Sequence, residues 1–327
     1  MNKFIFTCGD INGIGPEIVI KALNKISIKS KDRLIFICPG NVFNNTSRIV
    51  IPYFNFKETK KISDLNNIKG NIVLLNPGNF KQNIGKPTKV SGEAAFNSIE
   101  LSLEICERRL GEAVTTPPIS KTAIQMAGHN FPGHTEIFAE RFNVKNFVMM
   151  FLSKNMNAAL ATIHEPIKKI PGLITKGNIT AKLDVIIKSL LVDLKIDSPK
   201  IAVLGLNPHA GENGIIGNEE LNTLIPIIKD KKYNRYLSGP FSPDAFFANK
   251  MHKKFDLVFG MYHDQVLIPF KLMNFGEGVN FTAGLPIVRT SPDHGTAFDI
   301  AGKGIADESS LISAFLYAKK ILNNRKV

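Results

Sequence analysis

The sequence has few cysteines, and the three it has lie far apart. Cys8, Cys38 and Cys106 each fall in an apolar stretch, and no CxxC pair occurs in the 327 residues. An odd number of distant cysteines argues against a disulfide-stapled fold and against a cysteine-based zinc or redox motif. We therefore expect three reduced core residues in a cytoplasmic protein.

Long hydrophobic runs are also absent. No apolar stretch approaches the roughly 18 residues that a membrane-spanning helix needs. The opening residues, MNKFIFTCGD, reach Gly9 and Asp10 too soon to be a secretory signal. The sequence therefore predicts a protein without a membrane partner.

Acidic residues are in the minority, since 28 Asp and Glu stand against 41 Lys and Arg, a formal net charge of +13. The basic residues are spread along the chain, as at Lys60, Lys168 and Lys319, and no nucleic-acid-binding module is recognisable. We expect no nucleic-acid partner. The positive charge instead favours anionic small molecules.

Two common site motifs are missing. Glycines 9, 13 and 15 in GDINGIGPE do not have the GxGxxG spacing of a dinucleotide-binding Rossmann fold, and no HExxH zinc motif is present. There is also no internal repeat and no low-complexity linker. A Rossmann domain is therefore not expected, and any metal site would have to be assembled from distant segments.

Short apolar, β-branched runs alternate with helical patterns along the chain. The predicted strands are 3–8, 33–38, 71–76, 112–117, 146–152, 158–163, 201–206 and 256–262. A helix is predicted over 92–111, and another after Asp307, with Ile312, Phe315, Leu316 and Ile321 on its apolar face. This alternation is typical of an α/β protein whose parallel or mixed sheets are covered on both faces.

Three of the seven histidines closely follow predicted buried strands. His164 follows 158–163, His209 follows 201–206, and His263 follows 256–262. Ligands of open α/β sheets bind beyond the carboxyl ends of the strands, so the three imidazoles should lie along one rim. Three imidazoles and an open position are the ligand set of a catalytic divalent metal. The alternative for each is a structural or solvent-facing loop histidine.

Carboxylates and cations stand near these histidines in the sequence. Asp264 directly follows His263, and Asp244 lies in the loop GPFSPDAFF. Beside a metal, such a carboxylate could be a ligand, orient a histidine or act as general base. Alone, Asp244 would read as an Asx turn. Residues 270–304 contain Lys271, Asn280 and Arg289, and Arg289 follows an apolar run, which argues against a purely surface role.

Residues 133–138, GHTEIF, precede a helical stretch. Thr135 is a candidate N-cap of that helix. The alternative is that the amides of the helix start bind an anion.

Several segments together resemble the 4-hydroxythreonine-4-phosphate dehydrogenases, NAD-dependent enzymes of vitamin B6 synthesis. The segments are GIGPE at 13–17, FPGHTE at 131–136, GLNPHAGENG at 205–214, MYHDQ at 261–265 and GVNFTAGLPIVRTSPDHGTA at 278–297. They occur in the expected order over nearly the whole chain. Three positions depart from the family pattern: Ile11 and Asn12 stand in the first loop, and Val266 replaces a glycine after His-Asp-Gln.

The resemblance implies a two-domain α/β fold of the isocitrate/isopropylmalate dehydrogenase type with a central cleft. One domain, on the NAD side, would comprise residues 1–125 and 276–327, and the other, on the metal and dimer side, residues 126–275. The implied assembly is a homodimer with a shared active site.

The resemblance also implies roles for individual residues. The expected metal ligands are His164, His209 and His263, and the ion would be Zn, Mg or Co. The expected substrate contacts are His134, Thr135, Lys271, Asn280 and Arg289. His294 and Asp299 lie in a stretch similar to the adenosine-binding loop of the wider superfamily. Asp244, Asp264 and Lys271 remain alternatives for the group that takes the hydroxyl proton.

The implied reaction is the NAD-dependent oxidation of 4-phosphooxy-L-threonine at its C3 hydroxyl, followed by decarboxylation to 3-amino-2-oxopropyl phosphate. One alternative is a dehydrogenase for a related phosphorylated hydroxy acid, phosphothreonate or phosphoerythronate. The others are a metal-dependent phosphohydrolase and a non-catalytic phosphate-sugar binder.

Overall fold

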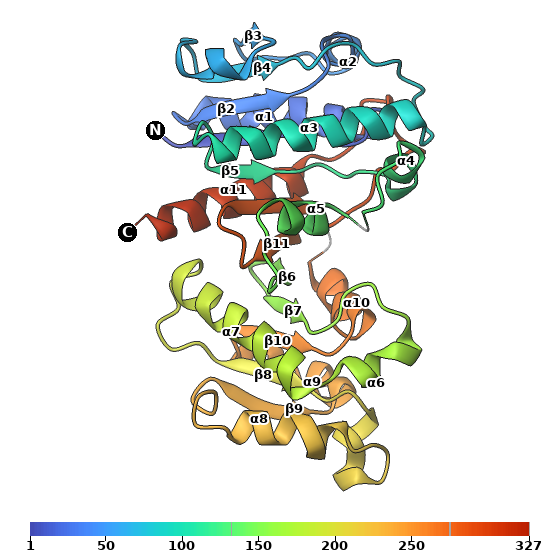
Figure 1. Ribbon diagram of the computed structural model, residues 1–327, viewed down its shortest axis with the longest axis vertical. Helices are drawn as coiled ribbons and strands as arrows, with labels where there is room; N and C mark the ends of the chain where they lie inside the picture. The colour runs from blue at the N-terminus through green and yellow to red at the C-terminus, as the bar shows by residue number, and fades with distance from the viewer. Residues whose placement is uncertain (132, 275, 327) are drawn as a thin grey trace. The chain divides into compact units, whose positions relative to one another are not determined.

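The computed structural model describes residues 1–131, 133–274 and 276–326. Their contacts divide the chain into two compact units (Figure 1). Unit 1 comprises Met1–Asn143 and Leu285–Leu322, and unit 2 comprises Val144–Gly284 and Asn323–Val327. The chain therefore passes from unit 1 into unit 2 and returns.

Unit 1 contains a wholly parallel run of strands in the order β3-β4-β2-β1-β5-β12. The strands are β1 (Lys3–Phe6), β2 (Arg33–Ile37), β3 (Lys57–Thr59), β4 (Ile72–Leu75), β5 (Ala113–Thr115) and β12 (Val288–Pro292). The helices are α1 (Gly15–Lys29), α2 (Gly40–Ser47), η1 (Ile62–Asn66), α3 (Lys89–Glu107), α4 (Lys121–Met126), α5 (His134–Arg141) and α11 (Ser309–Arg325).

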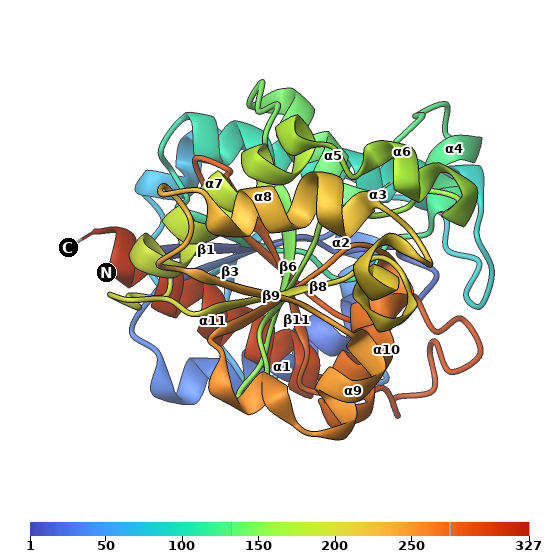
Figure 2. The same cartoon turned by 90° about the horizontal axis from the view of Figure 1, so that it is seen from below.

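Helices cover both faces of these strands, with α3 on one side and α1 and α11 on the other (Figure 2). Strands covered on both faces are apolar throughout, which is why β1 and β2 read as continuous hydrophobic runs. Phe4 and Phe6 are fully buried, and their ring centroids lie 4.9 and 5.8 Å from that of Phe315 on α11. These aromatic contacts fix the C-terminal helix to the sheet.

Unit 2 has a mixed run of strands in the order β11-β6-β7-β10-β8-β9. The strands are β6 (Val148–Leu152), β7 (Ala158–Leu160), β8 (Ile201–Leu204), β9 (Leu237–Phe241), β10 (Leu257–Gly260) and β11 (Val279–Ala283). The helical elements are η2 (Ile167–Lys169), α6 (Ile170–Leu173), α7 (Lys176–Val192), η3 (Pro208–Gly214), η4 (Glu220–Leu224), α8 (Ile225–Lys229), α9 (Pro243–Ala248), η5 (Met251–Lys254) and α10 (His263–Met273).

Within unit 2, β6 pairs antiparallel with β7 and β11, whereas β7, β10, β8 and β9 run parallel. Figure 2 shows α7 and α8 on one face of these strands and α9 and α10 on the other. Phe246 of α9 and Phe270 of α10 are buried in the same hydrophobic core as Phe151 of β6. That core holds α9 and α10, which carry predicted site residues, against the sheet.

The compact units end later in the chain than the sequence-based boundaries after residues 125 and 275. Helix α5 belongs to unit 1, where Arg141 at its end bonds Glu107 of α3 at 2.8 Å. Strand β11 belongs to unit 2, where it pairs with β6 over five residues. Residue 275 itself lies outside the described residues.

All eight strands predicted from the sequence are present, and each is shorter than predicted by one to three residues. The sequence analysis missed β3, β9, β11 and β12. Charged residues in β3, a Gly-Pro pair in β9 and polar residues at alternate positions in β11 hide these strands from a search for apolar runs. Mixed strand direction and helices on both faces confirm the α/β class.

The helix predicted after Asp307 is α11, and Asp307 accepts a hydrogen bond from the backbone N–H of Ser309 at 2.7 Å. One residue of its predicted apolar face was wrong, because Leu316 is 56% exposed whereas Phe315 and Ile321 are buried. The three cysteines are unpaired and buried, as predicted. No helix among the described residues is long and apolar enough to cross a membrane.

Candidate functional site

The three predicted metal ligands follow three adjacent parallel strands. Strand β10 pairs in parallel with β7 on one side and with β8 on the other. His164, His263 and His209 follow β7, β10 and β8, respectively. Because neighbouring parallel strands end at the same edge of a sheet, the prediction that these imidazoles occupy one rim of the sheet is confirmed.

His164 and His263 lie side by side on this rim. Their ring centroids are 6.0 Å apart, and the ring planes are inclined by 40°. His263 Nδ1 is 2.6 Å from Asp264 Oδ1, and the His263 side chain is 41% exposed. A carboxylate on Nδ1 fixes the tautomer that offers Nε2 as a ligand, the usual arrangement of metal-binding histidines. The pair therefore fits a divalent metal chemically.

His209 is presented by an unusual backbone. It is exposed and lies in η3, where five consecutive residues, 209–213, have positive φ. Its imidazole is close enough to Asp244 to help lower the pKa of that carboxyl group, after the larger effects of hydrogen bonds from Ser242 and Ala245. Ser242 Oγ donates to Asp244 Oδ1 at 2.5 Å. His209 therefore faces a carboxylate on α9.

Among the residues that the structure describes, no three His, Cys, Asp or Glu side chains are grouped closely enough to hold a metal ion. A single chain thus brings His164 and His263 together but does not add His209 to them. The three-histidine set therefore remains a prediction. In a single chain, the pair of His164 and His263 would need a third ligand from elsewhere.

The predicted catalytic carboxylates share one hollow in unit 2. Asp244 and Asp264 both line a cavity of about 350 Å³ formed by α9 and one side of α10. Its wall also contains the exposed apolar residues Ile268 and Leu272, which are 58% and 81% exposed. Lys271, the third candidate base, is exposed on the same helix. The hollow therefore combines acidic groups with an uncovered apolar helix face.

Arg289 is the most deeply buried cation of the predicted substrate contacts. It lies on β12 with 2% exposure, and its Nε and Nη2 donate to Thr116 Oγ1 at 3.1 and 2.7 Å. Nη1 is 3.5 Å from Thr135 Oγ1. Burial lowers the pKa of Arg289 to about 9, so the guanidinium remains charged at neutral pH. A buried guanidinium held by hydroxyls is suited to bind a phosphate or carboxylate.

His134 and Thr135 begin helix α5 beside this guanidinium. The expected N-cap role of Thr135 was wrong, because Gly133 occupies the N-cap position and the Thr135 hydroxyl meets Arg289 instead. Burial, with a smaller effect from Arg289, holds the pKa of His134 well below its usual value. Its Nε2 is buried and has no hydrogen-bond partner among the described residues. A neutral imidazole with an unmatched nitrogen is ready for a ligand hydrogen bond.

Asn280 shows a similar unmatched group in unit 2. Its Oδ1 is buried without a hydrogen-bond partner among the residues described, although the side chain lies on a paired strand, β11. Buried polar atoms are normally hydrogen-bonded, so an unmatched amide oxygen indicates a place for a ligand donor.

The predicted NAD-site residues lie on a long loop of unit 1, between β12 and α11. His294 Nδ1 is 3.1 Å from the carbonyl oxygen of Gly295, and Asp299 is exposed. Helix α1 anchors this loop. Glu17 accepts the backbone N–H of Ala306 at 2.9 Å, and Lys21 donates to the Ala306 carbonyl at 2.6 Å.

The departures from the family pattern are accommodated within the fold. Asn12 is buried and donates to the carbonyl of Lys86 and to the Thr88 hydroxyl. Val266 is fully buried, and a Cβ at Gly260 would lie only 1.9 Å from one of its methyl groups. The valine at 266 therefore requires a glycine at 260.

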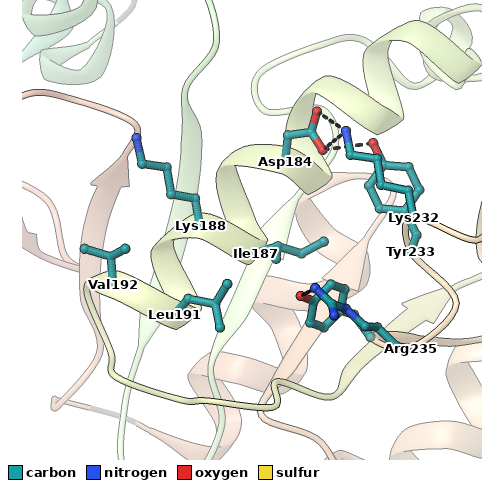
Figure 3. Close-up of a pocket in the computed structure, with 9 residues that line it drawn as sticks. Asp184, Ile187, Lys188, Leu191, Val192, Lys232, Tyr233 and Arg235 are labelled. Carbon is teal, nitrogen blue, oxygen red and sulfur yellow. Dashed lines mark hydrogen bonds and ion pairs between the residues drawn. The ribbon is translucent and has the colours of Figure 1, made fainter.

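A second hollow in unit 2, of about 290 Å³, lies between α7 and the segment that precedes β9 (Figure 3). Asp184 bonds Lys232 and Tyr233 there, and Arg235 stacks on Tyr236. Its lining contains none of the predicted site residues. This hollow is therefore separate from the predicted site residues.

The sequence analysis missed three residues that support the site. Thr116 holds Arg289, Glu17 anchors the loop of Asp299, and Glu220 binds the base of the His209 turn. Glu17 stands in the motif GIGPE, but Thr116 and Glu220 had no signal beyond their polarity. The partner of Thr116 is Arg289, which is distant in the sequence. The partner of Glu220 is Asn207, at the base of a turn that the sequence did not predict.

Comparisons with known proteins show the family to which the chain belongs. The profile of the family described as "Pyridoxal phosphate biosynthetic protein PdxA" matches residues 30–318. A 4-hydroxythreonine-4-phosphate dehydrogenase from Sulfurihydrogenibium sp. is 40% identical, and the alignment covers 100% of both chains. Crystal structures of enzymes of that name from Klebsiella pneumoniae and Burkholderia phymatum have TM-scores of 0.82 and 0.77. They are 30% and 32% identical, and each covers 98% of both chains.

Proposed function

The chain belongs to the pyridoxal phosphate biosynthetic protein PdxA family, and from this we propose that it oxidises 4-phosphooxy-L-threonine at the C3 hydroxyl with NAD. Decarboxylation of the resulting 3-keto acid would give 3-amino-2-oxopropyl phosphate. Family membership makes the chain an oxidoreductase of pyridoxine phosphate synthesis. The substrate, NAD and the metal are the parts that we propose.

The observation that carries the proposal is the cluster of Arg289, His134 and Thr135. Arg289 is 2% exposed and is held by the hydroxyls of Thr116 and Thr135, so its guanidinium is fixed before any ligand arrives. A preorganised cation of this kind favours a planar or tetrahedral anion, and the substrate carries both a carboxylate and a phosphate. Neutral His134 would add a directed hydrogen bond to the same anion.

We propose that His164, His209 and His263 hold a divalent ion. Their imidazoles suit Zn²⁺ or Co²⁺ better than Mg²⁺, which prefers oxygen ligands. The contact between His263 and Asp264 supports this role, because it orients one ring for coordination. When bound, such an ion would lower the pKa of the substrate hydroxyl and later polarise the carbonyl.

The proton of the C3 hydroxyl must pass to a nearby base. Asp264 is engaged with His263, and hydrogen bonds lower the pKa of Asp244, which makes Asp244 a weaker base. Lys271 is the remaining candidate from the sequence. We keep all three as proposed proton acceptors, with Asp244 the least suited because its carboxylate form is already stabilised.

NAD would accept the hydride from C3. We propose that His294 and Asp299 contact its adenosine half, on the loop that Glu17 and Lys21 fasten to helix α1. Asp299 is exposed and can offer a carboxylate to ribose hydroxyls. Asn280, with its unmatched Oδ1, would accept a hydrogen bond from the substrate.

We propose a homodimer with a shared metal site. A single chain groups only two of the three histidines, and the apolar residues Ile268 and Leu272 are uncovered on α10. A second copy seated on this face would bury those side chains near His263, at the start of the same helix. We expect the dimer to work in the cytoplasm, where the three buried thiols stay reduced.

The test compares substrates in one NADH-forming assay with added Zn²⁺ or Co²⁺. We expect turnover of 4-phosphooxy-L-threonine, a much lower kcat/KM for phosphothreonate and phosphoerythronate, and loss of activity with a chelator. A preference for the substrates without an amino group would assign the chain to the related dehydrogenases. Phosphate release without NADH would indicate a hydrolase, and the absence of any turnover would indicate a binding protein.

A further inference from the structure

The turn that carries His209 has a backbone that its side chains do not favour. Residues 209–213 have φ of 53°, 51°, 83°, 45° and 56°, and only the third of them is a glycine. Left-handed backbone is disfavoured for L-residues because Cβ approaches the following carbonyl. Four non-glycine residues among five consecutive positions in or beside this region therefore need support from the surrounding structure.

Glu220 supplies this support at the base of the turn. Its carboxylate is 1% exposed and accepts the backbone N–H of Asn207 at 2.8 Å through Oε1. Its Oε2 accepts the side-chain amide of Asn207 at 2.9 Å, and Glu219 accepts from the same amide at 2.7 Å. These three hydrogen bonds fix Asn207, two residues before His209.

The same carboxylate packs against the turn on either side of His209. A Cβ added at Gly205 would lie 3.1 Å from Glu220 Oε1, and one added at Gly211 would lie 2.7 Å from Oε2. These glycines let the chain close around the carboxylate. Glu220 therefore sets the position of the backbone both before and after the histidine.

We propose that Glu220 is a positioning residue for His209: it holds the left-handed turn in the conformation that presents the imidazole to the metal. The inference rests on the proposed role of His209 as a ligand. Glu220 itself is too deeply buried under the turn to reach a ligand at the rim. Its effect should therefore appear as weaker metal binding through His209.

The test measures Co²⁺ binding to the purified full-length protein by calorimetry, with the visible spectrum of bound Co²⁺ as a second readout. We expect Glu220→Gln to weaken binding about tenfold, in the range found for residues that orient metal ligands. The altered spectrum should show a changed ligand field. Asn207→Ala, which keeps the carboxylate and the backbone N–H bond to it, should weaken binding about fivefold, because the two hydrogen bonds of the side-chain amide to Glu219 and Glu220 are lost.

Glu17→Gln is the matched control. Glu17 is 3% exposed and also accepts backbone N–H groups, but it holds a loop of unit 1. We expect this variant to lose thermal stability to a similar degree and to keep the wild-type Co²⁺ affinity. If both glutamate variants lost Co²⁺ affinity, the effect of Glu220→Gln would be explained by general destabilisation of the protein. This result would overturn the proposal.

His209→Ala separates this inference from the proposed function. If His209→Ala binds Co²⁺ like the wild type, the ligand assignment fails, and the role of Glu220 fails with it. If His209→Ala loses affinity but Glu220→Gln and Asn207→Ala do not, the ligand assignment stands and the positioning role is overturned. Should Glu220→Gln not fold, the Asn207→Ala result decides between these outcomes.

Discussion

The two groups of predicted site residues differ in how complete they are. Arg289 in unit 1 is 2% exposed and already held by two threonine hydroxyls, whereas the His263 side chain in unit 2 is 41% exposed. Unit 1 encloses its cation within one chain. In the described part of unit 2, one chain groups two histidines but not three.

This difference indicates two ways of preparing a site. A buried guanidinium is costly to desolvate, so its presence is explained best by an anion that it binds. Exposed imidazoles lose little solvation free energy in the single chain. They can therefore remain without a ligand until a metal and a second chain bind. The predictions below separate the preformed cation from the incomplete histidine group, in order of expected effect.

Arg289→Met should have the largest effect, because it removes the fixed cation without leaving a void. We expect kcat/KM for 4-phosphooxy-L-threonine to fall about 1000-fold, in the range for truncating a buried hydrogen-bonded charge pair. The melting temperature should not fall, since a desolvated charge is removed with it. Arg141→Met, a change of a half-exposed arginine on α5, is the control. Near-normal kcat/KM in the Arg289 variant would show that the cluster is purely structural.

His263→Ala tests the histidine group. We expect the affinity for Zn²⁺ or Co²⁺, measured by calorimetry, to fall by about 100-fold or more, because a ligand counts for at least as much as the groups that orient it. Asp264→Asn should cost about tenfold, since it alters only the partner of His263 Nδ1. His129→Ala, which removes a ring stacked on Phe96 in unit 1, should leave the affinity unchanged. Unchanged binding in His263→Ala would exclude this rim as the metal site.

Leu272→Asp tests whether a second chain completes the histidine group. Leu272 is 81% exposed, and a charge there should raise the dimer dissociation constant about tenfold or more in sedimentation experiments. Metal affinity should fall in parallel at low protein concentration. Ile51→Asp, at an exposed position in unit 1, should change neither property. Dissociation without loss of metal binding would show that one chain suffices.

The smallest effect concerns pH and His134. Because burial holds its pKa well below the usual value, the unfolded state takes up a proton first as the pH falls. Stability should therefore decrease below about pH 6.5, by at most about 1.4 kcal/mol per pH unit from this group. His134→Asn cannot titrate and should flatten that slope in urea unfolding between pH 7.5 and 5.5. An unchanged slope would mean that His134 takes up its proton as readily in the folded protein as in the unfolded chain, and it would contradict the lowered pKa.

Much of the framework could be predicted from the sequence because apolar runs and strand ends carry local signals. Such patterns predicted the eight strands and the position of the histidines at one rim. The apolar run before Arg289 also indicated that Arg289 is not a surface residue. The contact between Arg289 and Thr116 joins residues 173 positions apart, which no local pattern encodes. The left-handed turn at His209 was hidden as well, because alanine and glutamate, which occupy positions 210 and 212, rarely adopt positive φ.

The role of Thr135 illustrates why the remaining site was harder to predict. The residue sits one position inside the helix start, so the local pattern offered capping and anion binding as alternatives. Its actual partner is a guanidinium on a strand 154 residues away. Tertiary contacts of this kind decide which of two locally reasonable roles a side chain takes.

The most direct test of the proposed chemistry follows NADH and carbon dioxide together in one reaction. The metal-loaded protein, given NAD and 4-phosphooxy-L-threonine, should form both products in equal amounts, and a chelator should abolish both. Phosphate release without NADH, or full activity in the presence of the chelator, would contradict the account.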